Sequence, residues 1–114
     1  MGRSRRERVS EGGRTIRLQE LIREEVNYLL RCEVTDARLQ GVAITFVQLA
    51  GDGSCARLWF TADGDQDRTE ALEHAAGFLR SQLAESLALK RTPDLRFRRD
   101  PATRTLLAPG EEVS

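Results

Sequence analysis

The chain has 114 residues, a length suited to one domain, and its 39% hydrophobic residues can form a modest core. No run approaches the roughly 18 apolar residues of a membrane helix, and no apolar stretch follows the arginine-rich start, which argues against a secretory signal. We therefore expect a soluble, cytoplasmic protein with no membrane partner, in which Cys32 and Cys55 are isolated, reduced thiols.

The formal net charge is zero, but the charges are unevenly distributed along the chain. Residues 1–17 contain six arginines against two glutamates, and residues 88–104 contain six basic residues against two aspartates. Acidic residues gather between residues 63 and 73. Because phosphate binding depends on the local patch rather than on the sum, this pattern is compatible with a nucleic-acid-binding protein. Two solvated or disordered ends are the alternative.

The N-terminal third is predicted to contain an arm and a helix. Residues 1–13 combine Arg, Ser, Gly and Glu with almost no apolar content, which favours a flexible basic arm. From about Ile16 to Cys32, apolar residues recur at three- and four-residue steps, as in a helix with one buried side.

A β-hairpin, a helix and a third strand are predicted next. Residues 42–49 and 55–61 are β-branched and aromatic runs on either side of the turn cluster 51–54. Helical periodicity follows over about residues 66–87, and residues 94–98 alternate between polar and apolar. Within the hairpin, adjacent strand residues point to opposite faces, so we place Phe60 in the core. For Trp59 we favour packing over base stacking, because no other aromatic is expected beside it.

These elements predict a single α+β domain over residues 14–100, flanked by the arm 1–13 and a C-terminal tail 101–114. A helical crossover normally makes the two strands that it joins parallel neighbours, and the hairpin adds an antiparallel strand. The expected order is α-β-β-α-kink-α-β, with a three-stranded mixed sheet and helices on one face.

The sequence carries no recognisable catalytic or metal-binding motif. His74 is the only histidine and lies in a predicted helix, where a lone histidine is usually a surface or packing residue. Asp63, Asp65 and Asp67 are spaced like the first ligands of a calcium loop, but Arg68 and His74 stand where that loop needs Gly and Glu. We therefore expect no enzymatic activity, no cofactor and no metal.

Three segments, in this order, carry a family pattern. Residues 17–39 end in TDARL, residues 75–81 read AAGFLRS, and residues 90–97 read KRTPDLRF. They resemble the first helix with its Asp-Pro-Arg-Leu turn, the Ala-x-Gly-Phe segment and the last strand of ribosome-binding factor A. Ala37 stands where that family usually has proline, and the acidic C-terminus lacks the basic tail of some members.

The resemblance implies a type II KH-like domain that binds the 30S ribosomal subunit and its 16S rRNA, and that is monomeric off the ribosome. It further implies a role in late subunit maturation, in 16S rRNA processing and in adaptation to cold. In this family an Ala-x-Gly kink, here Ala75, Ala76 and Gly77, replaces the usual Gly-x-x-Gly loop. The alternative is a generic KH-like RNA-binding or protein-interaction module not tied to the ribosome.

Basic side chains in or near these segments are the candidate phosphate contacts. They are Arg14, Arg17, Arg38, Arg80, Lys90, Arg91, Arg96, Arg98 and Arg99. At the kink, Gly77 is expected to adopt an unusual φ that lets RNA or a helix approach closely. In a straight helix, alanine at that position would instead stabilise the protein.

Overall fold

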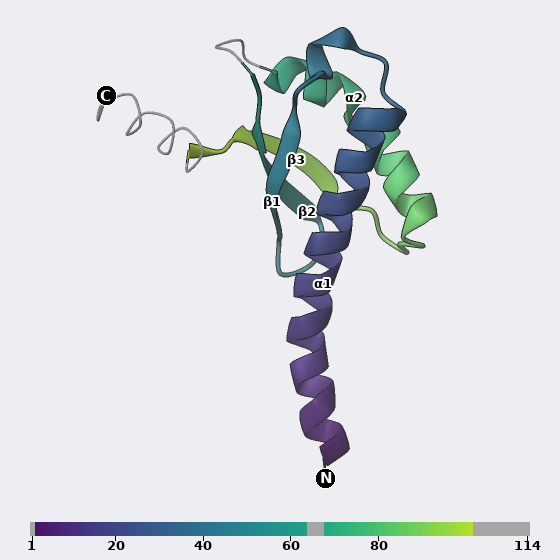
Figure 1. The fold of residues 1–114 in the computed structure, drawn as a ribbon. Helices are drawn as coiled ribbons and strands as arrows, with labels where there is room; N and C mark the ends of the chain where they lie inside the picture. The colour runs from purple at the N-terminus through teal and green to yellow at the C-terminus, as the bar shows by residue number, and fades with distance from the viewer. Residues whose placement is uncertain (1, 64–67, 102–114) are drawn as a thin grey trace, which may run out of the picture.

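The chain forms two long helices and a three-stranded sheet, shown in Figure 1. The computed structural model describes residues 2–63 and 68–101, and describes residues 2–12 by their backbone alone. In chain order the elements are α1 (Gly2–Cys32), the 3₁₀ turn η1 (Ala37–Leu39), β1 (Ala43–Leu49), β2 (Cys55–Thr61), α2 (Thr69–Ser86) and β3 (Asp94–Arg99).

The strand order β1-β2-β3 confirms the predicted mixed sheet. β1 and β2 pair as an antiparallel hairpin, and β2 and β3 pair as parallel strands on either side of the crossover through α2. Gly53 in the hairpin turn has φ +76°, a conformation that glycine adopts without a steric penalty. The turn cluster predicted from the sequence therefore closes the hairpin.

Both helices cover the same face of the sheet. α1 packs against β1, α2 packs against β3, and the two helices contact each other. Every second residue of β2 and β3 is buried beneath them: Ala56, Leu58, Phe60, Leu95 and Phe97. Phe60 is 0% exposed, which confirms its predicted place in the core. The opposite face of the sheet, called the open face below, carries no helix among the described residues.

α1 also closes the outer edge of β1 with two side-chain amides. Asn27 Nδ2 donates to the carbonyl of Ile44 at 3.0 Å, and the Ile44 N–H donates to Asn27 Oδ1 at 2.7 Å. Further along, the Leu49 N–H donates to Gln19 Oε1 at 3.0 Å. An edge strand otherwise leaves such main-chain groups without a protein partner, and here the helix satisfies them.

The N-terminus differs from its predicted form. α1 begins at Gly2 rather than near Ile16, so the helix starts earlier than predicted and includes the backbone of residues 2–13. Figure 1 shows this first part of α1 extending away from the sheet. This first part lacks the apolar stripe that was used to predict the helix, so the predicted helix starts too late in the sequence.

α2 is one continuous helix through Ala75, Ala76 and Gly77, so the two segments expected on either side of the kink belong to a single helix. Figure 1 shows the path of α2 changing direction between its first and second halves, but the helical assignment is continuous. Gly77 is not among the positive-φ glycines, and nothing lies within 4 Å of where its Cβ would stand. The bend therefore needs neither an unusual φ nor a close approach at this glycine.

Two other predicted segments lie partly or wholly outside the described residues. The turn expected at Asp63-Gly64-Asp65 and the first residues of the second predicted helix fall in or next to the undescribed stretch 64–67, and α2 as described begins at Thr69. Of the predicted tail 101–114, only Pro101 is described.

Candidate RNA-binding surface

β3 presents two of the predicted arginines on the open face. Its residues alternate, so Leu95 and Phe97 enter the core while Arg96 and Arg98 are exposed, as expected from the sequence. Because β3 is an edge strand, both arginines also line a hollow of about 500 Å³ between β3 and α2. Ala76 and Glu73 line the same hollow from the helix. The fold thus brings part of the Ala-x-Gly segment and the β3 arginines into one groove.

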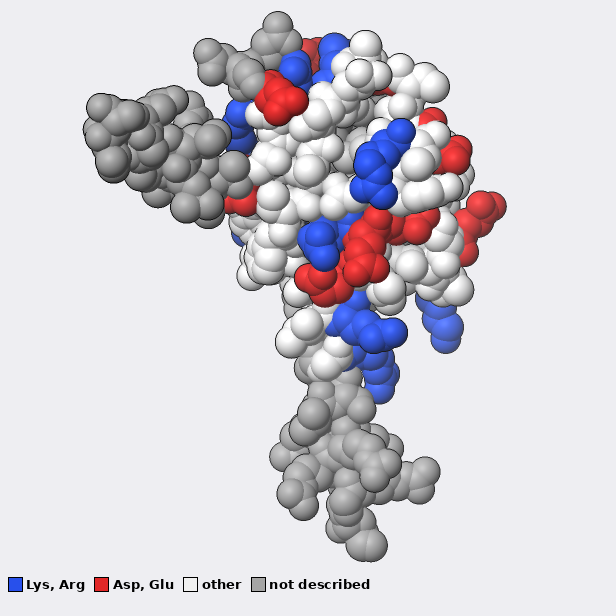
Figure 2. Space-filling model, in the orientation of Figure 1, with Lys and Arg blue, Asp and Glu red and all other residues white. Residues whose placement is uncertain are grey.

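Four further cations lie at the end of the domain that carries the hairpin turn, and we call them the basic end: Arg14, Arg17, Lys90 and Arg91. Arg14 and Arg17 line a hollow of about 760 Å³ together with turn residues 50–53. On the other side, Arg91 Nη1 lies 3.5 Å from the carbonyl oxygen of Asp52 in the same turn. All four are exposed, and Figure 2 shows blue side chains projecting from this end of the body.

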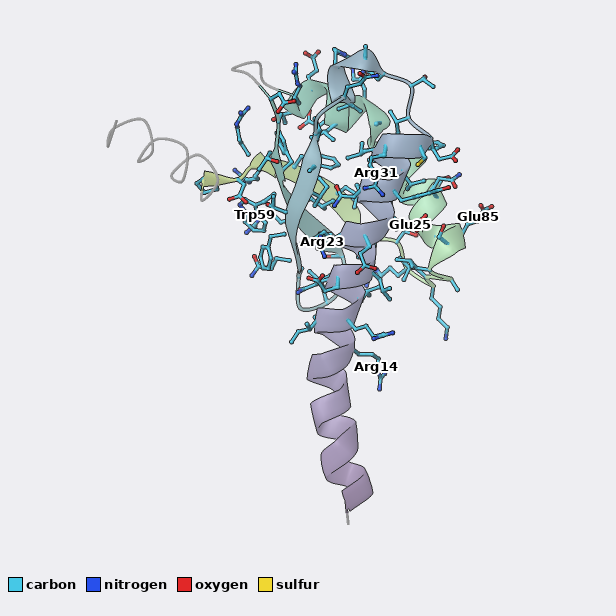
Figure 3. The ribbon with its side chains drawn as sticks, in the orientation of Figure 1. Arg14, Arg23, Glu25, Arg31, Trp59 and Glu85 are labelled. Carbon is cyan, nitrogen blue, oxygen red and sulfur yellow. The ribbon has the colours of Figure 1, made fainter. Side chains whose placement is uncertain are left out.

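Figure 3 labels Arg14 where α1 leaves the body of the domain. The helix continues from there toward its N-terminus through a stretch whose sequence contains Arg3, Arg5, Arg6 and Arg8. The basic end is therefore built from two regions far apart in the chain, as the two basic segments of the sequence suggested.

Two predicted RNA contacts also make hydrogen bonds within the protein. Arg80 Nε donates to the carbonyl of Pro93 and its Nη2 donates to the carbonyl of Thr92, both at 3.0 Å. Arg99 Nη2 donates to the carbonyl of Ala62 at 3.2 Å. These guanidinium groups tie α2 and β3 to neighbouring segments, which gives them a structural role that sequence alone did not indicate.

Arg38 is paired with a carboxylate two residues away. Its Nη2 lies 2.8 Å from Asp36 Oδ2 and its Nε lies 3.1 Å from Oδ1. The side-chain hydrogen bond from Arg38, reinforced by its backbone N–H, lowers the pKa of the Asp36 carboxyl below its ordinary value. Asp36 also caps η1, and Leu39 is buried in the core, so the TDARL segment fixes the turn between α1 and β1.

Two residues of the open face were missed as candidates. Arg57 on β2 lies opposite Arg96 and is exposed, but it lies outside the basic segments of the sequence. Phe46 on β1 was not considered as a site residue. A register shift between Ile44 and Phe46 places Phe46 opposite Trp59, where it is 49% exposed. The bulge has no clear sequence signal, since neither Gly nor Pro marks it.

Among the side chains described, those of residues 13–63 and 68–101, no group of three or more His, Cys, Asp or Glu is placed to hold a metal ion. Cys32 and Cys55 are free, at exposed and half-buried positions. None of the described helices is long and apolar enough to span a membrane.

The pattern of elements and motifs matches one protein family. The family model described as ribosome-binding factor A matches residues 14–107 of the sequence. The chain belongs to the ribosome-binding factor A family. A ribosome-binding factor A from Heliobacterium modesticaldum is 40% identical over 93 residues, which cover 78% of this chain and 77% of the relative.

Solved structures of ribosome-binding factor A share the fold. The crystal structure of the Thermus thermophilus protein has a TM-score of 0.70 and 23% identity, and covers 75% of this chain and 93% of that chain. A Thermus thermophilus model fitted into the cryo-EM map of a 30S complex has a TM-score of 0.65 and 24% identity, with the same coverage of 75% and 93%. At these identities the likeness is one of architecture.

Two of the segments that carry the ribosome-binding factor A pattern serve mainly to hold the fold. Asp36 and Leu39 fix the first turn, and Arg80 fastens the approach to β3. The exposed cations of the basic end and of β3 therefore remain the better candidates for contacts outside the chain.

Proposed function

We propose that this protein binds the small (30S) ribosomal subunit through its 16S rRNA and assists late maturation of that subunit. Membership of the ribosome-binding factor A family carries the proposal. A model of a relative with the same fold has been fitted into a map of a 30S complex, which supports the partner. The proposal includes 16S rRNA processing, growth in the cold, a cytoplasmic location and a role without catalysis.

The basic end is the proposed principal contact with rRNA. Its four exposed cations lie on both sides of the hairpin turn and can meet phosphates without rearrangement of the core. Phosphate contacts of this kind supply most of the sequence-independent affinity of nucleic-acid-binding proteins. The groove between α2 and β3 adds Arg96 and Arg98, although Glu73 in the same groove opposes an RNA strand there.

Co-sedimentation of the protein with small subunits at low salt tests the proposal. The double variant Lys90→Gln, Arg91→Gln removes two cations of the basic end, and we expect it to bind clearly more weakly than the unaltered protein. Arg23→Gln, Arg31→Gln is the matched control, because it removes the same charge from α1 outside the basic end. There Arg23 is paired with Glu20 at 2.7 Å. Equal binding by both variants would show that the basic end does not contact the subunit. Absence of binding by the unaltered protein would refute the proposed function.

The maturation role is tested in cells that lack the protein. We expect them to accumulate unprocessed 16S rRNA, more strongly at low temperature, and to recover when the unaltered gene is supplied. Normal rRNA processing at all temperatures would leave subunit binding without a maturation function and favour the generic RNA-binding module.

A further inference from the structure

The open face of the sheet carries an aromatic pair at its centre, formed by Phe46 on β1 and Trp59 on β2. The two rings have centroids 5.3 Å apart and are inclined at 43°. Phe46 is 49% exposed and Trp59 is half-buried, so both rings remain accessible from the open side. Figure 3 labels Trp59 at the side of the sheet away from the helices.

The β-bulge in β1 creates this pair. Strict alternation from Ile44 would direct Phe46 into the core, but the register shift at Thr45 returns it to the open face opposite Trp59. The core does not take up Phe46, although burial of a phenylalanine side chain is worth about 1.5–3 kcal/mol. β-bulges often occur next to functional sites, where they redirect a side chain, and exposed apolar patches often mark binding surfaces.

Arginines surround the aromatic pair on the same face. The register sets Arg98 of β3 opposite Trp59, and sets Arg57 and Arg96 opposite each other one step along the strands. The Arg57 guanidinium carbon lies 5.9 Å from the centroid of the Trp59 ring. All three arginines are exposed.

Two carboxylates lie near this face, Asp94 at one end of the strands and Asp100 beside Thr45, whose hydroxyl also contacts the carbonyl of Trp59 at 3.3 Å. Asp94 pairs with Cys55 at one end of the strands and is 3.7 Å from Arg80. Asp100 follows the other end of β3 and accepts a hydrogen bond from the hydroxyl of Thr45. The centre of the described open face is therefore aromatic, with Arg57, Arg96 and Arg98 around it and Asp100 at one side.

We propose that the open face is a second RNA contact, on which an unpaired base stacks against Trp59 and Phe46 while Arg57 and Arg98 bind the flanking phosphates. Exposed aromatic rings with neighbouring arginines are the chemistry by which proteins hold single-stranded nucleic acid. This inference rests on the proposed function and adds to it, because the basic end alone binds phosphates and does not distinguish paired from unpaired RNA.

The simpler explanation is that the ring pair only stabilises the hairpin, since cross-strand aromatic pairs do so by themselves. It accounts for the contact between the rings but not for the three arginines around it. The two explanations differ in what they predict for RNA binding.

Trp59 is the only tryptophan, so its fluorescence reports this site alone. We expect a short unstructured oligoadenylate to change the emission strongly, and an RNA duplex of equal length to leave it nearly unchanged. Phe46→Leu retains the reporter and should weaken oligoadenylate binding by roughly 5- to 100-fold, the usual range for loss of a stacked ring. Phe78→Leu is the matched control, because Phe78 is similarly exposed, at 42%, but lies on α2.

Thermal unfolding of each variant separates loss of binding from loss of fold. A Phe46→Leu protein that is less stable but binds oligoadenylate normally would overturn the inference, as would an equal response to duplex and single strand. Emission that changes with intact subunits but not with oligoadenylate or protein-free 16S rRNA would also overturn it and identify a protein partner. Co-sedimentation of the unaltered protein, measured in parallel, distinguishes failure of this second contact from failure of ribosome binding itself.

Discussion

Arg80 shows how a basic residue of a family segment can serve the fold. Its two hydrogen bonds to the carbonyls of Thr92 and Pro93 hold the segment before β3 against α2. The ion pair with Asp94, at 3.7 Å and largely exposed, adds little to stability. The carbonyl contacts are therefore the main contribution of this side chain.

We predict that Arg80→Ala lowers the free energy of unfolding by about 1–2 kcal/mol, because two partly buried carbonyls lose their partners. Urea unfolding measures the change. Arg96→Ala is the control, since that exposed side chain should change stability by less than about 0.5 kcal/mol. Equal stability of the two variants would show that water replaces the arginine without cost.

Gly77 gives the second prediction at the scale of single residues. Its backbone is helical and the space around its missing Cβ is open. Alanine should therefore fit and raise the free energy of unfolding by roughly 0.5–1 kcal/mol, because glycine is a poor residue for a helix interior. Thermal unfolding of Gly77→Ala tests this, and a lower melting temperature would mean that the bend of α2 depends on the glycine.

At the scale of elements, α1 acts as cover for the edge of β1 as well as for the face of the sheet. Asn27 makes two hydrogen bonds with the main chain of Ile44, as a neighbouring strand would. A further edge group, the N–H of Leu49, donates to Gln19, which lies two turns earlier in the helix. β1 is thereby less available as a template for pairing with another chain.

We predict that Asn27→Ala destabilises the protein by about 1–3 kcal/mol, because a part-buried donor and acceptor both lose their partner. Glu24→Ala, on the exposed side of the same helix, is the control and should be nearly neutral. Chemical unfolding gives the difference, and size-exclusion chromatography shows whether the uncovered edge promotes self-association. A neutral Asn27→Ala would mean that the edge needs no cover from this residue.

Elements with strong local patterns were predictable from the sequence. The hairpin between residues 43 and 61 follows from its β-branched runs and its glycine-containing turn, and the parallel pairing of β3 follows from the crossover rule. The helical conformation of the first residues of α1 was not predictable, because no apolar stripe marks them. The exposure of Phe46 could not be read from the sequence, because a one-residue bulge reverses the faces of a strand without changing its composition.

The candidate surface was predictable only in part, for a similar reason. Charge clustering identified Lys90, Arg91, Arg96 and Arg98, which are exposed. It also selected Arg99, and the family-like segment 75–81 selected Arg80; both donate to main-chain carbonyls of other segments of the chain. Whether an arginine faces solvent or a carbonyl depends on tertiary contacts, which a pattern of residue types does not contain.

At the scale of the whole molecule, charge is separated between regions. Figure 2 shows most of the acidic side chains over α1 and α2, with a few basic side chains among them and further basic side chains projecting from the end below. Figure 3 labels Glu25 on α1 and Glu85 on α2 in the acidic region. Acidic groups repel phosphates and basic groups attract them, so this separation orients the molecule as it approaches RNA. A protein with no net charge can in this way still bind a polyanion.

The separation predicts a strong dependence of subunit binding on salt. Each phosphate contact releases condensed counterions, so 6–10 contacts would weaken binding by about 10³- to 10⁵-fold between about 50 and 200 mM salt. The slope of log affinity against log salt is negative. Removal of two cations in Lys90→Gln, Arg91→Gln should reduce its magnitude by about 2, or about 1 for each phosphate that is no longer neutralised. Arg23→Gln, Arg31→Gln carries the same change in net charge outside the basic end and should leave the slope as it is. Co-sedimentation across a salt series measures all three slopes, and identical slopes would place the phosphate contacts elsewhere on the molecule.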